Sequence, residues 1–387
     1  MSSAWLLPEH IADVLPARAR HIETLRRGLL DAAAGFGFEL VIPPMLEHIE
    51  SLLSGTGHSL DLQTFKLVDQ LSGRTLGLRA DSTPQVARID AHMLNRSGIA
   101  RLCYCGPVLH ARPSGSAATR ELLQFGAEVY GHEGLGADLE ILDLMLECLH
   151  VAAIEDVVVD LADARIVRAV LAGVPVDAAR LDAVYAALAA KDAAEIRALG
   201  AAFAAPVRQG LEALIELYGD DSVLDEAARA LPQRPAIAGA LADLRRLAAS
   251  ARRSHPRARI GFDLADSSGY AYYSGARFAA YARGASDAIA RGGRYDEVGA
   301  IFGRNRPAVG FGLDVKELAM LSLPPASAEP VRAPAGDAAA LREAIRALRA
   351  RGEIVVAELG DGESAAATAA AGRRLVETTG GWTVAPR

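Results

Sequence analysis

The stretch from Arg101 to Gly131 constrains the fold of this chain more than any other part of the sequence. It contains two apolar runs, Arg101–Leu109 and Leu122–Tyr130, on either side of the polar segment Ala111–Arg120. Apolar runs bounded by proline, glycine, serine and threonine in this way predict two antiparallel strands joined by a long loop. We therefore expect the rest of the chain to be organised around this hairpin.

The second predicted strand has two different faces, because successive side chains of a strand point to opposite sides. Its apolar face consists of Leu123, Phe125, Ala127 and Val129. The other face carries an amide and a carboxylate, Gln124 and Glu128, on either side of Gly126. A glycine leaves open space above the sheet, so this face is a candidate floor of a polar ligand site. A solvated face of an antiparallel sheet is the alternative interpretation of the same pattern.

The chain has 387 residues, which allows one large domain with a smaller one, or two to three domains. Of these residues, 51% are hydrophobic and 23% are charged, which is ample for a packed core. Residues 1–321 are expected to form the main domain. Within it, the stretch at about 163–254 is rich in Ala, Leu and Arg and predicts a helical insertion. The Pro- and Ala-rich residues 322–336 indicate a linker, and 337–387 a small α/β domain.

Several shorter elements are predicted from local patterns. A helix should begin near Pro84, which suits a first helical position, and run to about Leu94. Ala271–Ala282 has the composition of a strand. The segment ARGGRYDEVG, Ala290–Gly299, is typical of a glycine turn that enters a helix, and Ser364–Gly372 of a further helix.

The charge balance and cysteine content exclude several classes of protein. The net charge is −7 and no broad basic stripe is present, so nucleic acid is not an expected partner. No run of about 18 apolar residues predicts a membrane span, and the N-terminus lacks the pattern of a signal peptide. Three cysteines without metal-ligand spacing, Cys103, Cys105 and Cys148, indicate no zinc site and fit the reducing cytoplasm.

Segments in a fixed order resemble the motifs of class II aminoacyl-tRNA synthetases. Pro44–Glu47 resembles their first motif, Arg101–Gly131 their second and Ala308–Leu318 their third. The segments LRADSTPQVAR, RELLQFGAEVYG, SGYAYYSG and RGGRYDEVG resemble the histidine-site segments of histidyl-tRNA synthetase. The resemblance extends from about Pro8 to Leu321 and implies an α+β fold, in which an antiparallel sheet is flanked by helices.

The same resemblance implies a set of histidine-binding residues, namely Asp81, Thr83, Gln124, Glu128, Tyr272 and Tyr273. The acid and the threonine correspond to the groups around the substrate ammonium, although the acid is usually Glu in the synthetase. A carboxylate and neutral acceptors suit an ammonium group. Glu128 corresponds to the acid that holds the imidazole, with the two tyrosines nearby. A carboxylate and a phenol can satisfy both imidazole nitrogens, and leaving a buried polar group unpaired costs about 1–3 kcal/mol, which would reject other amino acids.

The sequence departs from the synthetase where arginines would hold ATP. The run GPVLHARP is one residue shorter than in the family and keeps only Arg112. Ser268 stands where the family has a catalytic arginine, and Glu317 where the third motif ends in arginine. Arginine forks stabilise phosphate charge, so these changes leave little basis for adenylation. Possible supports of the pocket are Arg112, Arg120 and Arg294. How the histidine carboxylate would be held stays open.

The region after Leu318 is also shorter than the roughly 100 residues of a typical small domain, which an anticodon-binding domain would need. A histidine pocket without adenylation chemistry resembles the family of ATP phosphoribosyltransferase regulatory subunits. That resemblance implies a non-catalytic subunit without a cofactor, with L-histidine as its effector. It also implies that the protein activates the short-form catalytic subunit in histidine biosynthesis and transmits feedback inhibition, as a homodimer core within a hetero-octamer.

Two other functions are compatible with the sequence. A diverged histidine–tRNA ligase would retain histidine-dependent exchange between ATP and pyrophosphate. A synthetase-like enzyme that acts on a different acid would need a nucleophile and a base, for which Ser268 and His110 are the candidates. No acidic residue that would orient His110 is evident, so this last interpretation is the weakest.

Overall fold

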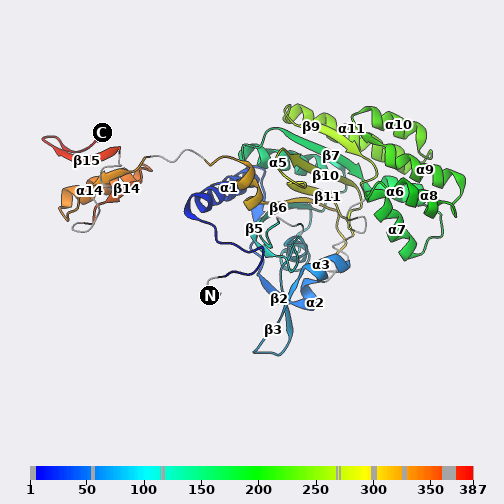
Figure 1. The fold of residues 1–387 in the computed structure, drawn as a ribbon, viewed down its shortest axis with the longest axis horizontal. Coiled ribbons are helices and arrows are strands. Elements are labelled where there is room, and N and C mark those ends of the chain that lie inside the picture. The colour runs from blue at the N-terminus through cyan, green and yellow to red at the C-terminus, as the bar shows by residue number, and fades with distance from the viewer. Residues whose placement is uncertain are drawn as a thin grey trace. The chain divides into compact units, whose positions relative to one another are not determined.

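The computed structural model describes residues 6–53, 57–113, 115, 118–266, 269, 272–297, 303–324, 329–359 and 372–386. The chain divides into two compact units, 1–324 and 325–387. Each unit is built on its own sheet (Figure 1). None of the helices in the described ranges has the length and apolarity needed to cross a membrane.

The first unit contains a large sheet whose strands follow the order β1-β5-β6-β12-β11-β10-β7-β9-β8. Their bounds, in that order, are Glu39–Leu40, Ala100–Leu109, Glu121–Tyr130, Ala308–Asp314, Ala290–Arg294, Ala276–Ala282, Val157–Asp163, Arg259–Asp263 and Tyr218–Gly219. The β1–β5 and β7–β9 pairs are parallel, and the other pairs are antiparallel. This confirms the predicted α+β fold with a largely antiparallel sheet.

Strands β5 and β6 form the predicted hairpin, with a register that runs from Ala100 opposite Tyr130 to Leu109 opposite Glu121. Both faces of β6 are buried near its end. Phe125 lies in the main core, and Glu128 on the opposite face is only 1% exposed. The interpretation of that face as solvated is therefore wrong, because a second group of buried side chains, which includes Tyr104 and Tyr295, covers it.

Helices cover the apolar face of the sheet. These are α1 (Pro16–Gly35), α5 (Leu135–Val151), α11 (Pro235–Ser254) and α13 (Val315–Leu321). The buried residues of α1 recur at helical spacing, at His21, Ile22, Leu25, Leu29 and Ala33. All of these except His21 join the buried residues of β6 and α5 in one core cluster, which packs against the apolar face of β6.

Residues 164–254 form a helical segment at the β7–β9 end of the sheet (Figure 1). Besides α11 it contains α6 (Ala164–Leu171), α7 (Ala178–Ala189), α8 (Ala193–Gly200), α9 (Ala205–Glu216) and α10 (Ser222–Ala230). The aspartates that precede α6, α7 and α8 accept hydrogen bonds from backbone N–H groups of the first turn, and this local capping explains where these helices begin.

A smaller sheet, of order β2-β4-β3, lies in the N-terminal part with α2 (Ile49–Leu52) and α3 (Gly57–Gln63). Its strands are Leu46–His48, Thr75–Leu78 and Phe65–Val68 in that order. The helix predicted to begin near Pro84 is found as α4 (Thr83–Arg88), but it continues as the π-helix η1 (Ile89–Leu94). Asn95 ends it in the left-handed conformation, with φ of 44°.

Two predictions of local structure, one of a strand and one of a turn, need correction. Strand β10 begins at Ala276, so Tyr272 and Tyr273 precede the strand and lie in a turn whose N–H groups donate to Gly269 O. The predicted glycine turn at 290–299 is instead strand β11 up to Arg294. Its glycines are required by close packing, because a Cβ atom at Gly292 would overlap the ring of Phe278.

The second unit has a sheet of order β14-β13-β15-β16 and one described helix, α14 (Ala339–Ala350). The strands are, in that order, Val355–Ala357, Val331–Ala333, Arg373–Thr378 and Gly381–Pro386. Strand β13 lies inside the stretch predicted as a linker, which corrects that prediction for its second half. Val331 and Ala333 are fully buried, so they belong to the core of this unit. The helix predicted at 364–372 falls almost entirely outside the described residues.

Candidate functional site

A cavity of about 360 Å³ lies over strands β6, β12 and β11. The six residues predicted to bind a ligand all line it, namely Asp81, Thr83, Gln124, Glu128, Tyr272 and Tyr273. They come from three segments that are far apart in the sequence, the start of α4, the strand β6 and the turn before β10. The fold therefore gathers the predicted set around one space, which the sequence pattern alone did not require.

Glycines of β12 provide the room in which two of these side chains lie. Gly310 pairs with Glu128, and a Cβ atom at Gly310 would overlap the Glu128 carboxyl group. Gly312 lies beside Gln124, since a Cβ atom there would be 3.5 Å from Gln124 Nε2. The carboxyl and amide groups thus extend from β6 across the bare backbone of the next strand.

Glu128 is held by two buried tyrosines. Tyr295 donates its hydroxyl hydrogen to Oε2 of Glu128 at 2.5 Å, and Tyr104 donates to Oε1 at 3.1 Å. Burial raises the pKa of Glu128 to about 8, against the opposing effect of the Tyr295 hydrogen bond. At neutral pH this carboxyl group is therefore largely protonated, and it can donate one hydrogen bond and accept others.

Asp81 lines the same cavity in a fixed orientation. Its Oδ1 atom accepts hydrogen bonds from Gln124 Nε2 at 2.8 Å and from the Thr83 backbone N–H at 3.0 Å. Gln124 is itself fixed, because its Oε1 atom accepts from the backbone N–H of Ser82 at 2.9 Å. Oδ2 of Asp81 has no hydrogen-bond partner among the described residues, so it can serve a cationic group of a ligand.

Tyr272 and Tyr273 form an aromatic wall and have no described hydrogen bond to Glu128. Their ring centroids are 5.2 Å apart in an edge-on arrangement, and Tyr272 stacks on Tyr295 at 4.9 Å. The hydroxyl partners of Glu128 are Tyr104 and Tyr295, which the sequence reasoning missed. The pairing of Tyr104 with Gly126 in the hairpin was a signal, since a glycine opposite a tyrosine leaves space for its ring.

None of the three arginines proposed as pocket supports is among the described residues that line the cavity. Arg112 is exposed on the hairpin loop. Arg120 lies 4.8 Å from the ring centre of Phe65 and donates to the His110 carbonyl. Arg294 forms a buried ion pair with Asp138 and stabilises the fold behind β11.

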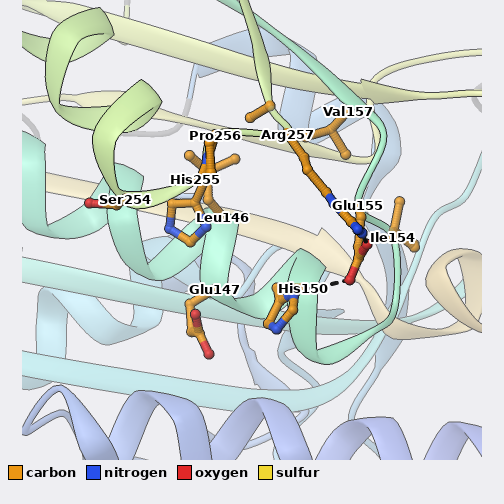
Figure 2. Close-up of a pocket in the computed structure, with 11 residues that line it drawn as sticks. Leu146, Glu147, His150, Ile154, Glu155, Val157, Ser254, His255, Pro256 and Arg257 are labelled. Atoms are coloured by element: carbon orange, nitrogen blue, oxygen red, sulfur yellow. Dashed lines mark ion pairs between the residues drawn. The ribbon is translucent and has the colours of Figure 1, made fainter.

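A second cavity, of about 450 Å³, lies between the end of α5 and the connection from α11 to β9 (Figure 2). Several of its polar groups are paired with one another or with nearby residues. Glu155 forms ion pairs with His150 and Arg257, and His255 lies 3.1 Å from Asp143. In the described ranges, no group of three or more His, Cys, Asp or Glu side chains is arranged to hold a metal ion.

Comparison with known proteins identifies the class that this fold and cavity define. A family model described as histidyl-tRNA synthetase matches residues 10–318. A solved structure from Bacillus halodurans, described as an ATP phosphoribosyltransferase regulatory subunit/histidyl-tRNA synthetase, aligns with a TM-score of 0.82 and 26% identity over 95% of this chain and 97% of that one. A histidyl-tRNA synthetase from Nostoc has a TM-score of 0.78 at 19% identity over 97% and 92%, and supports the fold alone. The first unit is thus a histidyl-tRNA synthetase-like, class II domain.

The C-terminal part of the chain and the full-length relatives identify a particular family within this class. Residues 328–385 match a model described as the ATP phosphoribosyltransferase subunit HisZ C-terminal domain, and the chain belongs to the family of ATP phosphoribosyltransferase regulatory subunits. A regulatory subunit from Variovorax paradoxus is 66% identical over 99% of both chains. One from Ralstonia pickettii is 55% identical over 100% of this chain and 99% of its own. The resemblance seen in the sequence is confirmed.

Proposed function

We propose that this regulatory subunit binds L-histidine in the cavity over β6 and transmits activation and feedback inhibition to the short catalytic subunit of ATP phosphoribosyltransferase. The observation that carries the proposal is the arrangement of Asp81 and Glu128. They present an ionisable oxygen at one wall of the cavity and a buried, largely protonated carboxyl group at another. Histidine has a matching group for each, because its ammonium group suits the Asp81 oxygen and its imidazole suits the Glu128 carboxyl group.

The imidazole is expected to bind at Glu128. A neutral imidazole has one N–H donor and one acceptor nitrogen, and a neutral carboxyl group has one donor and free acceptor capacity. The tyrosines that hold Glu128 fix its position, so the ligand ring needs no rearrangement of the pocket. The aromatic wall of Tyr272 and Tyr273 offers apolar surface to the ring. A cavity of about 360 Å³ is also within the usual range of small-molecule sites.

The residues at the positions where a synthetase would bind ATP support a non-catalytic role. The resemblance to the synthetase puts an ATP-binding arginine at the position of Glu317. Burial, followed by the nearby charge of Asp314, raises the pKa of Glu317 to about 7. The neighbouring Lys316 donates to the Glu121 carbonyl at 2.9 Å. An acidic group at this position does not stabilise phosphate charge, so adenylation of histidine is not expected. Ser268, at the other altered position, lies outside the described residues.

A diverged histidine–tRNA ligase is the second candidate function, since the similar protein from Bacillus halodurans is described as an ATP phosphoribosyltransferase regulatory subunit/histidyl-tRNA synthetase. The purified protein should decide between them. It should give no histidine-dependent exchange between ATP and pyrophosphate, whereas a ligase would exchange readily. Exchange at a rate typical of synthetases would contradict the proposed function.

The proposed assembly is a homodimer core within a hetero-octamer, in the cytoplasm. Exposed apolar side chains follow the N-terminal edge of the large sheet, where β1 is the outermost strand. Leu40 is 49% exposed and Ile42 82% exposed. Ile42 lies two residues after the end of β1, and exposed apolar groups on and beside an edge strand favour association with a second copy. Light scattering of the isolated subunit should give a dimer, and a monomer at micromolar concentration would contradict this.

The central experiment measures L-histidine binding and its effect on the catalytic subunit. Calorimetry should detect one L-histidine per chain, and heat that is absent at millimolar ligand would overturn the sensor role. In the reconstituted complex, Gln124→Ala should reduce inhibition by histidine while activation persists, because it removes the residue that fixes Asp81. Arg27→Ala, on an exposed helix face, is the control and should leave both properties unchanged.

A further inference from the structure

The wall of the histidine cavity includes a cation that the sequence analysis did not identify. Arg291, on β11, lines the cavity beside Gly292. Among the described lining residues it is the only lysine or arginine. An amino acid carries a carboxylate beside its ammonium group at neutral pH, and a guanidinium fork is well suited to a carboxylate.

We propose that Arg291 binds the α-carboxylate of the amino acid whose ammonium group is held by Asp81. The inference rests on the proposed function, because it takes L-histidine as the ligand of this cavity. It makes Arg291 a specificity-determining residue that selects α-amino acids over amines and alcohols of the same shape. It also supplies a carboxylate partner at a position other than those where the resemblance puts the arginines of the synthetase.

The strand register puts the Arg291 side chain on the cavity face of the sheet, within reach of a ligand bound over β6. Arg291 is opposite Gly312 of β12, and Gly312 is opposite Gly126 of β6. Directly paired residues point to the same side of a sheet, and residues two apart on one strand also share a side. Gln124 and Glu128 each lie two residues from Gly126, so they share the side of Arg291. Neighbouring strands are about 4.8 Å apart, so the backbones of β11 and β6 are separated by roughly 10 Å. An arginine side chain and one amino acid together span that gap.

The space between Arg291 and Gln124 is open because Gly312 lies between them. A Cβ atom at Gly312 would meet only Gln124 Nε2 at 3.5 Å and the Phe125 carbonyl at 3.8 Å, which are ordinary contacts. The bare backbone at this point therefore leaves a passage between the two side chains. A carboxylate in the passage would reach the guanidinium of Arg291 from above β12.

The Arg291 guanidinium is weakly engaged without a ligand. Its Nη2 atom forms an ion pair with Oδ1 of Asp287, and the two side chains are 41% and 72% exposed. An ion pair this exposed is weak, because water screens it. The Nε and Nη1 atoms of Arg291 have no hydrogen-bond partner among the described residues. A ligand carboxylate can therefore bind these donors or replace Asp287.

Two other arginines near this wall are already committed. Arg168 donates to the Tyr273 carbonyl at 2.8 Å. Arg277 is 6% exposed, and its guanidinium lies 4.7 Å from the ring centre of Tyr273. It donates to the Asp266 carbonyl at 2.8 Å and is paired with the Asp266 carboxylate at 3.1 Å. Its charge is thus neutralised inside the fold, which leaves Arg291 as the partner of the ligand.

The test compares two ligands that differ only at the carboxylate. L-Histidine and L-histidinol share the ammonium group and the imidazole, but L-histidinol has a hydroxymethyl group in place of the carboxylate. Calorimetry is performed on the wild-type chain and on Arg291→Gln, Arg291→Lys and Arg245→Gln. Arg245 is the matched control, because its Nη2 atom also pairs with Oδ1 of an exposed aspartate, Asp225, at 44% and 73% exposure.

We expect Arg291→Gln to weaken L-histidine binding about tenfold or more, and L-histidinol binding less than about threefold. Arg291→Lys should recover part of the loss, and Arg245→Gln should match the wild type. If Arg291→Gln binds L-histidine as the wild type does, the inference fails while the proposed function stands. An equal loss for both ligands would also overturn it, since the effect would then not be directed at the carboxylate. A wild-type chain that binds no L-histidine would overturn the proposed function itself.

Discussion

The Tyr295 hydroxyl donates a hydrogen bond of 2.5 Å to Oε2 of Glu128, a side chain that is only 1% exposed. The hydrogen bond joins the residue that directly follows β11 to β6, across the glycine backbone of β12. It favours the ionised carboxylate, whereas burial favours the neutral acid, and burial has the larger effect. We therefore expect the protonation state of this one carboxyl group to link both the proposed ligand binding and the stability of the chain to pH.

The affinity for L-histidine should be highest between pH about 6.5, the ordinary imidazole pKa, and about 8, the pKa to which burial raises Glu128. In this range the free imidazole ring is neutral and the free Glu128 carboxyl group is protonated. The two together therefore already carry the one titrating proton that their complex needs. Below it a proton must be released on binding, and above it a proton must be taken up. Calorimetry from pH 5.5 to 9 should give a maximum, with limbs of at most about tenfold per pH unit.

The Glu128→Gln variant should lose the alkaline limb of that profile near pH 8, because an amide has no proton to lose there. Its acid limb should remain, since it arises from the ligand. Thr24→Ala, which alters a side chain on an exposed helix face, is the control and should keep both limbs. An unchanged alkaline limb in Glu128→Gln would show that another group causes it.

The stability of the ligand-free chain should fall as pH rises from 4.5, the ordinary pKa of a glutamate, to about 8. A carboxyl group whose pKa is raised by folding contributes stability that is fully present below its unfolded pKa and lost as pH passes its folded pKa. The slope from Glu128 is at most roughly 1.4 kcal/mol per pH unit. Urea unfolding at several pH values should give a shallower decline for Glu128→Gln than for the wild type. Parallel declines would contradict the prediction.

A Gly310→Ala substitution should destabilise the chain by about 1–3 kcal/mol, as overpacking of a filled interior does. The added methyl group would overlap the Glu128 carboxyl group. Gly312→Ala is the matched control on the same strand, because its methyl group would make contacts of 3.5 and 3.8 Å only. Thermal unfolding should separate the two variants by several degrees. Equal Tm values would mean that Glu128 can leave its position at little cost.

Breaking the buried ion pair between Arg294 and Asp138 should also be costly. Arg294→Ala leaves Asp138 buried without its charge partner, and such changes typically cost about 3–5 kcal/mol. The exposed pair between Arg27 and Glu23 offers a comparison, where Arg27→Ala should cost less than about 1 kcal/mol. Urea unfolding measures both values. A small effect at Arg294 would indicate that water reaches Asp138.

The hairpin and two members of the predicted ligand set, Gln124 and Glu128, were accessible from the sequence for a physical reason. The other four members came only from the resemblance to histidyl-tRNA synthetase. Strand alternation in β6 puts Gln124 and Glu128 on one face whatever the rest of the fold does. The tyrosines that hold Glu128 were not accessible in the same way. Tyr104 and Tyr295 reach it across strands, so their role depends on a register that no local pattern specifies.

Strand β11 shows how glycine can mislead a reading of sequence. Glycines usually mark turns, and Ala290–Arg294 has two of them in a row. Here they allow Phe278 and Tyr273 to approach the backbone closely, so they are part of the strand. Arg291 was not predicted as a cavity residue, because it shares a face with Gln124 and Glu128 only through the register that pairs it with Gly312. Strand β13 was missed because its three residues are flanked by prolines and alanines.

The bare backbone of β12 limits how this pocket can evolve. Single substitutions can readily alter a binding site whose floor is made of side chains. At Gly310 any side chain would collide with Glu128, so that position offers selection almost no viable alternatives. New ligand preferences in this lineage must therefore arise on the walls, on β6, in the turn of Tyr272 and Tyr273, or at Arg291.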